Sequence, residues 1–147
     1  MYFVDRQKIE ATLVFLDDHV QLIESKKTFN GQIEQLALER IVHIMIESVL
    51  DVGNLIIDGF IMRDPGSYED IIDILIDEKV VSKDDGEALK NIIRYRKMVV
   101  HDYLHINHKQ LIAEVQKNIA CIKTFSSSVL NYLANELGPV SAFRSER

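Results

Sequence analysis

The stretch from about Gln32 to Gly59 constrains the fold more than any other part of the chain. Its residues are apolar in nearly every direction around a helix axis, and it contains no proline, so one continuous helix can form. A helix that is apolar on most sides is buried, either at the centre of a helical bundle or against a partner chain. The sequence therefore predicts a long buried helix in one of these two settings.

A single row of polar side chains interrupts this helix. Successive members are three or four residues apart, which keeps them on one narrow face. They are Arg40, His43, Glu47, Asp51, Asn54 and Asp58. The row is either the solvent-exposed stripe of an amphipathic helix or the lining of a cleft, in which Glu47 or Asp51 faces cations from another helix. The sequence leaves both interpretations open.

Polar residues suited to capping a helix mark where the helices are expected to begin. These residues are Asp5, Asn30, Ser67, Ser82 and Asn107. The first helix should end near Ser25, the helix after Ser82 should continue to about Tyr103, and the last should end near Glu136. The sequence thus predicts an all-α, up-and-down bundle of about five helices in one domain, residues 1–136. Residues 137–147 lose the helical period and are expected to form a frayed C-terminal tail.

Several classes of protein are disfavoured. No apolar run has the length of a membrane span or of a signal-peptide core, and the single cysteine, Cys121, cannot form an internal disulfide. Both observations favour a cytoplasmic protein without a membrane association. No metal-binding spacing of Cys and His and no glycine-rich phosphate loop is present, so neither a metal nor another cofactor is expected.

Positive charge gathers in one segment of an acidic chain. The net charge is −6, yet Lys90 to Lys109 contains five Lys or Arg and one Asp, a local charge of +4, which leaves −10 for the rest. Such asymmetry is typical of a small basic site on a body that otherwise repels phosphate. Within this segment Arg94 and His101 are seven residues apart, as are Arg96 and Tyr103. On one continuous helix each pair would stack two turns apart.

The order Arg96-x-x-x-x-His101-x-Tyr103 resembles the Arg-x4-6-His-x-Tyr signature of HepT-like proteins of the HEPN superfamily. The long second helix and the order Pro65-x-x-Tyr68 also follow that family's layout, and the resemblance spans residues 5–135. One departure is Lys97, where the family usually has a small polar residue after the motif arginine.

The resemblance implies a metal-independent endoribonuclease that acts as a homodimer with a composite site. It implies Arg96 and His101 as catalytic residues, RNA as substrate and the toxin role in a toxin–antitoxin pair. It also implies a minimal nucleotidyltransferase antitoxin, with Tyr103 as the residue that the antitoxin AMPylates. Phosphates added at Tyr103 would neutralise nearby cations and block the RNA backbone.

The residue types suit this chemistry. Histidine exchanges protons near neutral pH, and the arginine fork binds two phosphate oxygens while staying charged. Arg96 and His101 are about 140° apart on one helix, so a two-fold dimer would bring them together more readily than one helix does. Arg94 is expected to be an auxiliary phosphate contact or an ion-pair partner of the acidic row, together with Glu47 and Asp51.

Blander interpretations remain beside the catalytic one. His101 can be a helix-end histidine paired with Asp102 or Glu47, and Tyr103 an interface aromatic. The whole chain can be a catalytically inactive HEPN-type module that binds nucleotide or RNA, or a dimeric helical scaffold.

Overall fold

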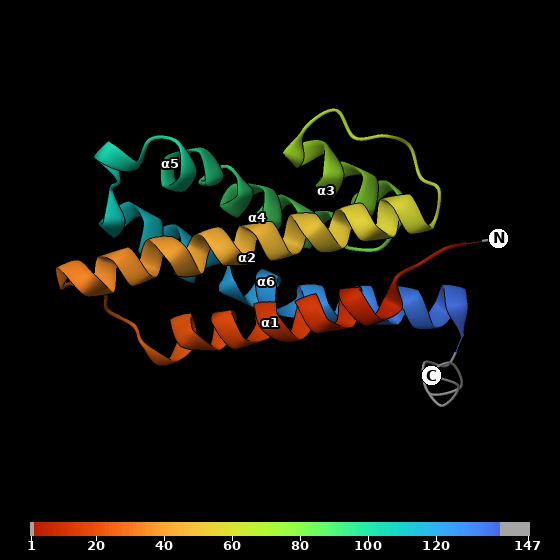
Figure 1. Ribbon diagram of the computed structural model, residues 1–147, viewed down its shortest axis with the longest axis horizontal. Coiled ribbons are helices and arrows are strands. Elements are labelled where there is room, and N and C mark those ends of the chain that lie inside the picture. Colours follow the sequence, from red (N-terminus) through yellow and green to blue (C-terminus); the bar gives the residue numbers. More distant parts are fainter. Residues whose placement is uncertain (1, 139–147) are drawn as a thin grey trace.

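The computed structural model describes residues 2–138, and all regular structure in that range is helical (Figure 1). The elements are α1 (Arg6–Ser25), α2 (Gln32–Gly59), α3 (Tyr68–Asp77), α4 (Lys83–Ile93), α5 (Arg96–Val100), the short 3-10 helix η1 (Tyr103–His105) and α6 (His108–Leu137). The predicted all-α bundle is confirmed. The expected frayed tail falls almost entirely on residues 139–147, which lie outside the described range.

Four of the five predicted caps are present. The side chains of Asp5, Ser67, Ser82 and Asn107 each accept a hydrogen bond from a backbone N–H in the first turn of their helix. Asn30 was the wrong choice for α2, which begins after Gly31 without a side-chain cap. The helix starts were therefore predictable to within a residue, because capping depends on local chain chemistry.

The long helix α2 lies at the centre of the bundle. In Figure 1 it runs the length of the molecule, with α1 on one side and the α3–α5 segment on the other, and it contacts α1, α3, α5 and α6. Its middle and C-terminal parts contribute a dozen buried residues, among them Val42, Ile46 and Leu50. Its first turns project further out, since Ile33 and Leu36 are exposed. Of the two settings that the sequence left open for this helix, the centre of the bundle is the one observed over most of its length.

Two helical glycines allow α3 to pack closely. A Cβ at Gly53 of α2 would lie 2.6 Å from Ile71 Cγ2, and one at Gly86 of α4 would collide with Ile76. Both helices therefore approach α3 at positions where no side chain fits between them. This close packing brings the start of α3, with Tyr68, against the segment that follows α4.

The helix expected from Ser82 to Tyr103 is interrupted, and that prediction was wrong. Helix α4 ends at Ile93, and the N–H of Tyr95 donates to the carbonyl of Ile92 three residues back, a 3-10-type bond that breaks the α-helical ladder. A five-residue helix, α5, follows, and Tyr103 lies beyond it in η1. Arg96 and Tyr103 are therefore not stacked two turns apart on one helix, and neither are Arg94 and His101.

Candidate active site at the start of α5

Arg96 is held from two sides at the first position of α5. Its Nε donates to Glu47 Oε1 at 2.7 Å, and its guanidinium carbon lies 4.4 Å from the centroid of the Tyr68 ring. The second distance is that of a cation–π contact. The hydrogen bond to Glu47 raises the pKa of Arg96 above its ordinary value, and this effect outweighs partial burial, which lowers the pKa. The guanidinium is therefore charged at any physiological pH and fixed in place.

Part of the polar row of α2 lines a groove, so the row is a cleft lining there rather than a plain solvent-exposed stripe. A hollow of about 660 Å³ lies between α1, α2 and α5, and Arg40, His43, Glu47 and Asp51 form part of its wall together with Arg96. His43 Nε2 lies 3.6 Å from Glu47 Oε1. The row is thus a cleft lining over these residues, and Glu47 is the carboxylate that faces a cation of the motif.

Asp51 is in the same groove without an ion pair of its own among the described residues. Partial burial raises the pKa of Asp51, the Glu47 carboxylate raises it further, and Lys8 lowers it. Asp51 therefore lines the groove beside Glu47 and makes no ion pair with Arg96.

Arg94 belongs to a different ion pair from the one expected. Its Nη2 donates to Glu69 Oε1 at 2.9 Å, and its Nη1 donates to Asn91 Oδ1 at 2.8 Å. The hydrogen bond to Glu69 raises the pKa of Arg94. The alternative that Arg94 pairs with the acidic row of α2 was wrong, because the break after Ile93 turns Arg94 toward α3. Its side chain is half exposed, so it remains open to a phosphate.

His101 is exposed at the C-terminal end of α5. Its backbone N–H closes the last turn on the carbonyl of Lys97 at 2.9 Å. Within residues 2–138 the imidazole has neither a hydrogen bond nor an ion pair, so the pairing with Asp102 or Glu47 does not occur. Asp102 instead lies 3.7 Å from the Lys97 ammonium. The ring of His101 is therefore accessible to a ligand.

Arg96 and His101 line the same pocket of a single chain. It has a volume of about 300 Å³, and its wall also includes Tyr68, Arg94 and Lys97. The sequence suggested that the two motif residues diverge around one helix, yet both contribute to this hollow. His101 also lines a neighbouring hollow of about 450 Å³ that includes Tyr103, whose side chain is 66 % exposed.

The positive charge expected here is largely compensated. Lys90 lies 2.7 Å from Asp73, and Arg94, Arg96 and Lys97 have the acidic partners described above. The site is consequently a set of positioned cations rather than a strongly basic patch. An arriving phosphate would compete with carboxylates for some of them.

Tyr68 and Glu69 are the site residues that the motif alone did not reveal. Both come from the start of α3, more than twenty residues before Arg96, and one contacts Arg96 while the other pairs with Arg94. The only sequence signal for Tyr68 was its place in the order Pro65-x-x-Tyr68 of the resemblance. Glu69 carried no signal beyond its fit to the first turn of a helix.

Residues 2–138 contain no group of three or more His, Cys, Asp or Glu side chains arranged to hold a metal ion. No helix in that range is long and apolar enough to cross a membrane.

Comparisons with known proteins agree with the fold and with the signature. A family model described as "Ribonuclease HepT-like" matches residues 9–129. A Bacillus subtilis (strain 168) protein named "Putative RNase YutE" is 49 % identical over 144 residues, which cover 98 % of this chain and 100 % of that protein. The solved structure of B. subtilis YutE, described as a cytosolic protein of unknown function, superposes with a TM-score of 0.93 at 50 % identity, covering 97 % and 100 % of the two chains.

A more distant structure shares the fold. It is a tri-AMPylated Shewanella oneidensis HEPN toxin in complex with its MNT antitoxin, with a TM-score of 0.71 at 18 % identity over 84 % of this chain and 95 % of that one. The family match covers most of the chain, includes the signature residues and agrees with a relative that is nearly half identical over its full length. The chain belongs to the ribonuclease HepT-like family.

Proposed function

We propose that the protein is a metal-independent endoribonuclease toxin in which Arg96 and His101 carry the chemistry. The observation that supports this most is that both side chains line one solvent-accessible pocket in a member of the ribonuclease HepT-like family. In this pocket the Arg96 guanidinium is charged and fixed by Glu47, and the imidazole ring of His101 is accessible. The proposed substrate is RNA, because in the proposed reaction the ribose 2′ hydroxyl attacks the neighbouring phosphate.

Cleavage needs one proton removed and one supplied. His101 accepts the 2′-hydroxyl proton as the 2′ oxygen attacks phosphorus, and the bond to the 5′ oxygen breaks. The leaving oxygen takes up a proton, which gives a 2′,3′-cyclic phosphate on one fragment and a 5′ hydroxyl on the other. Arg96 binds the non-bridging oxygens and stabilises the charge that builds up on them.

A second copy of the chain completes this scheme. One protomer supplies one imidazole, whereas the reaction uses a base and an acid at the same time. Because a two-fold interface presents the same surface from both partners, a dimer formed along the exposed end of α5 would place two His101 and two Arg96 in one cleft. The homodimer with a composite site is therefore part of the proposal.

Tyr103 is the proposed target of AMPylation by a minimal nucleotidyltransferase antitoxin. Its hydroxyl lies on an exposed 3-10 segment next to His101, and the Shewanella toxin that shares the fold is AMPylated in complex with its antitoxin. An added phosphate would place negative charge beside the catalytic cations and repel RNA. The cytoplasm is the proposed location, in keeping with the description of the YutE structure as a cytosolic protein.

The test is cleavage of single-stranded RNA by the purified protein with a chelator present. Wild type should cleave, Arg96→Ala and His101→Ala should lose about 100-fold or more of kcat/KM, and His19→Ala should match wild type. His19 is a suitable control because it is a partly exposed histidine on α1, hydrogen-bonded to the Phe15 carbonyl and outside the pocket of Arg96 and His101. Unchanged cleavage by either site variant would refute the assigned roles.

A catalytically inactive module is the competing outcome. It would bind RNA without cleaving it, and expression of the wild-type gene alone would leave bacterial growth unchanged. A toxin would arrest growth, and co-expression of the antitoxin or the His101→Ala substitution would restore it.

A further inference from the structure

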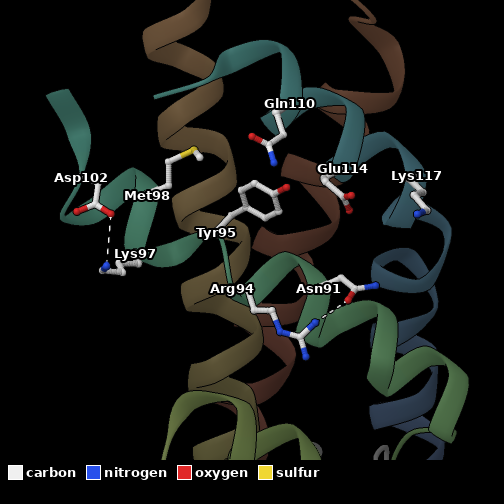
Figure 2. Close-up of a pocket in the computed structure, with 9 residues that line it drawn as sticks. All are labelled: Asn91, Arg94, Tyr95, Lys97, Met98, Asp102, Gln110, Glu114 and Lys117. Atoms are coloured by element: carbon white, nitrogen blue, oxygen red, sulfur yellow. Dashed lines mark hydrogen bonds and ion pairs between the residues drawn. The ribbon is translucent and has the colours of Figure 1, made fainter. Parts of the chain in front are cut away.

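A second hollow lies beside the pocket of Arg96 and His101, between the α4–α5 segment and the first turns of α6 (Figure 2). Its volume is about 490 Å³, enough for a nucleotide-sized group. Arg94 and Lys97 line both this hollow and the pocket that contains Arg96 and His101. The two hollows are therefore neighbours that share a wall of two cations.

One side of the second hollow offers an aromatic surface. Tyr95, from the turn after α4, is half-buried, and Figure 2 shows its ring in the middle of the lining residues, with the hydroxyl directed toward α6. Met98 extends this surface. An aromatic ring with an adjacent thioether is a suitable platform for a nucleobase of any identity, because every base has a flat π-face.

The opposite side comes from one face of α6. Gln110, Glu114 and Lys117 are spaced by four and three residues, so they share one face of α6, and all three line the hollow (Figure 2). The Gln110 amide can both donate to and accept from a base edge. Lys117 is exposed and has no ion pair within residues 2–138, which leaves its ammonium available to a phosphate.

Two carboxylates in the same wall do not prevent an anionic ligand from binding. Asp102 lies 3.7 Å from the Lys97 ammonium, and Glu114 Oε2 accepts a hydrogen bond from Asn118 Nδ2 at 3.2 Å. Each carboxylate is therefore already engaged by a neighbouring donor. Among the lining side chains, the three cations Arg94, Lys97 and Lys117 still exceed the two carboxylates by one. Lys117 is the cation of this set without an ion pair within residues 2–138.

We infer that this hollow is a nucleotide subsite for the part of the RNA chain that flanks the scissile phosphate. A base stacks on Tyr95, and the adjoining phosphate lies within reach of Arg94, Lys97 and Lys117. The inference rests on the proposed ribonuclease function, since it takes the pocket of Arg96 and His101 as the place where the chain is cut. RNA then continues across the shared wall and along α6.

The test measures binding of a fluorescent single-stranded oligoribonucleotide to the full-length protein. Tyr95→Leu should weaken binding at least fivefold because the stacking surface is lost, whereas Tyr95→Phe should remain within twofold of wild type. Lys117→Gln should weaken binding. It should also make the slope of log K against log salt concentration shallower by about one unit, because one phosphate contact is lost. Lys123→Gln is the matched control, because Lys123 is on the same helix, pairs with Glu24 and lies outside the hollow.

Tyr95 packs against the core, so its substitution must be accompanied by a thermal melt. Lys117 is exposed on α6, and its substitution keeps the test decisive if the Tyr95→Leu protein unfolds. Binding by both Tyr95→Leu and Lys117→Gln that equals wild type would overturn the subsite.

Cleavage kinetics separate this inference from the proposed function. If the wild type cleaves RNA, the subsite variants should raise KM more than they lower kcat, and unchanged KM in both would overturn the subsite alone. If the wild type binds RNA through Tyr95 and Lys117 but does not cleave it, the subsite stands and the ribonuclease proposal fails.

Discussion

Arg96 Nε and Glu47 Oε1 lie 2.7 Å apart although 49 residues separate them in the sequence. This ion pair joins the start of α5 to the middle of α2, the central helix of the bundle. The motif arginine is consequently oriented by a residue outside the motif, and Tyr68 covers its other side. The position of the motif guanidinium thus depends on three separate elements of the fold, α5, α2 and α3.

Replacement of Glu47 by glutamine should reduce catalysis far more than stability. The neutral amide still accepts a hydrogen bond from Arg96, but the attraction between the two opposite charges is lost. Arg96 should then be held less firmly, and kcat should fall about 10-fold. Because Glu47 is 36 % exposed, the free energy of unfolding should fall by less than about 1 kcal/mol. Single-turnover kinetics and urea unfolding measure the two effects.

Glu34→Gln is the control for that substitution. Glu34 is on the same helix and forms a 3.0 Å ion pair with Lys26, distant in sequence from the motif. Equal losses of activity in the two variants would show that Glu47 has no special role in orienting Arg96.

Tyr68 should act as a positioning residue through its ring rather than its hydroxyl. Tyr68→Phe retains the cation–π contact and should cleave RNA at nearly the wild-type rate. Tyr68→Leu loses the contact, and kcat should fall about twofold to fivefold with a smaller change in KM. Wild-type kcat in Tyr68→Leu would refute the role, as would equal losses in the two variants.

Gly86→Ala should destabilise the protein although alanine favours helices. The helix propensity gain is about 1 kcal/mol, whereas the collision of the new Cβ with Ile76 costs about 1–3 kcal/mol, so a net loss is expected. Chemical denaturation of Gly86→Ala measures it. Gly66→Ala is the comparison, because a Cβ there meets only Asp70 Oδ2 at 3.7 Å, and its stability should stay within about 0.5 kcal/mol of wild type.

Acid should loosen the loop that leads into α3. The hydrogen bonds from the Arg63 guanidinium, together with the one from the Gly66 N–H, lower the pKa of Asp70 to about 2. Since this pKa is depressed in the folded state, its contribution to stability is complete above about pH 4 and is lost as the pH falls toward 2. Arg63→Gln should therefore show a shallower loss of stability over that pH window. An identical acid slope in both proteins would contradict this assignment.

Much of the fold was predictable from local patterns. Apolar periodicity gave the extents of α1, α2 and α6, and polar caps gave four of the helix starts, because both depend on residues within a few positions of each other. The helical period did not show which residues at the margin of a helix's apolar face are buried in the core and which are exposed. Phe15, Leu36 and Leu130 are apolar residues of α1, α2 and α6 that nevertheless are exposed, since burial there depends on which helix lies opposite.

The break at Arg94 and Tyr95 was not predictable in the same way. It contains neither glycine nor proline, and the segment is anchored by Glu69 and Glu47, which lie 25 and 49 residues away from their partners. The motif residues themselves could be identified from the sequence, but their ion pairs and shared pocket could not. The homodimer, the roles of Arg96, His101 and Tyr103, and the boundary at residue 136 stay predictions.

Helix α5 has five residues, too few to persist by itself in water, since a helix this short forms barely one turn after a costly nucleation. Its position depends on two carboxylates from other helices: Glu47 of α2 pairs with Arg96, and Glu69 of α3 pairs with Arg94, which lies just before α5. For that reason, the presence of the Arg-His-Tyr signature alone is not enough to predict that a homologue cleaves RNA. Homologous chains that keep the signature but have lost the acidic anchor on the central helix should cleave RNA more slowly, and restoring that one carboxylate should raise their rate.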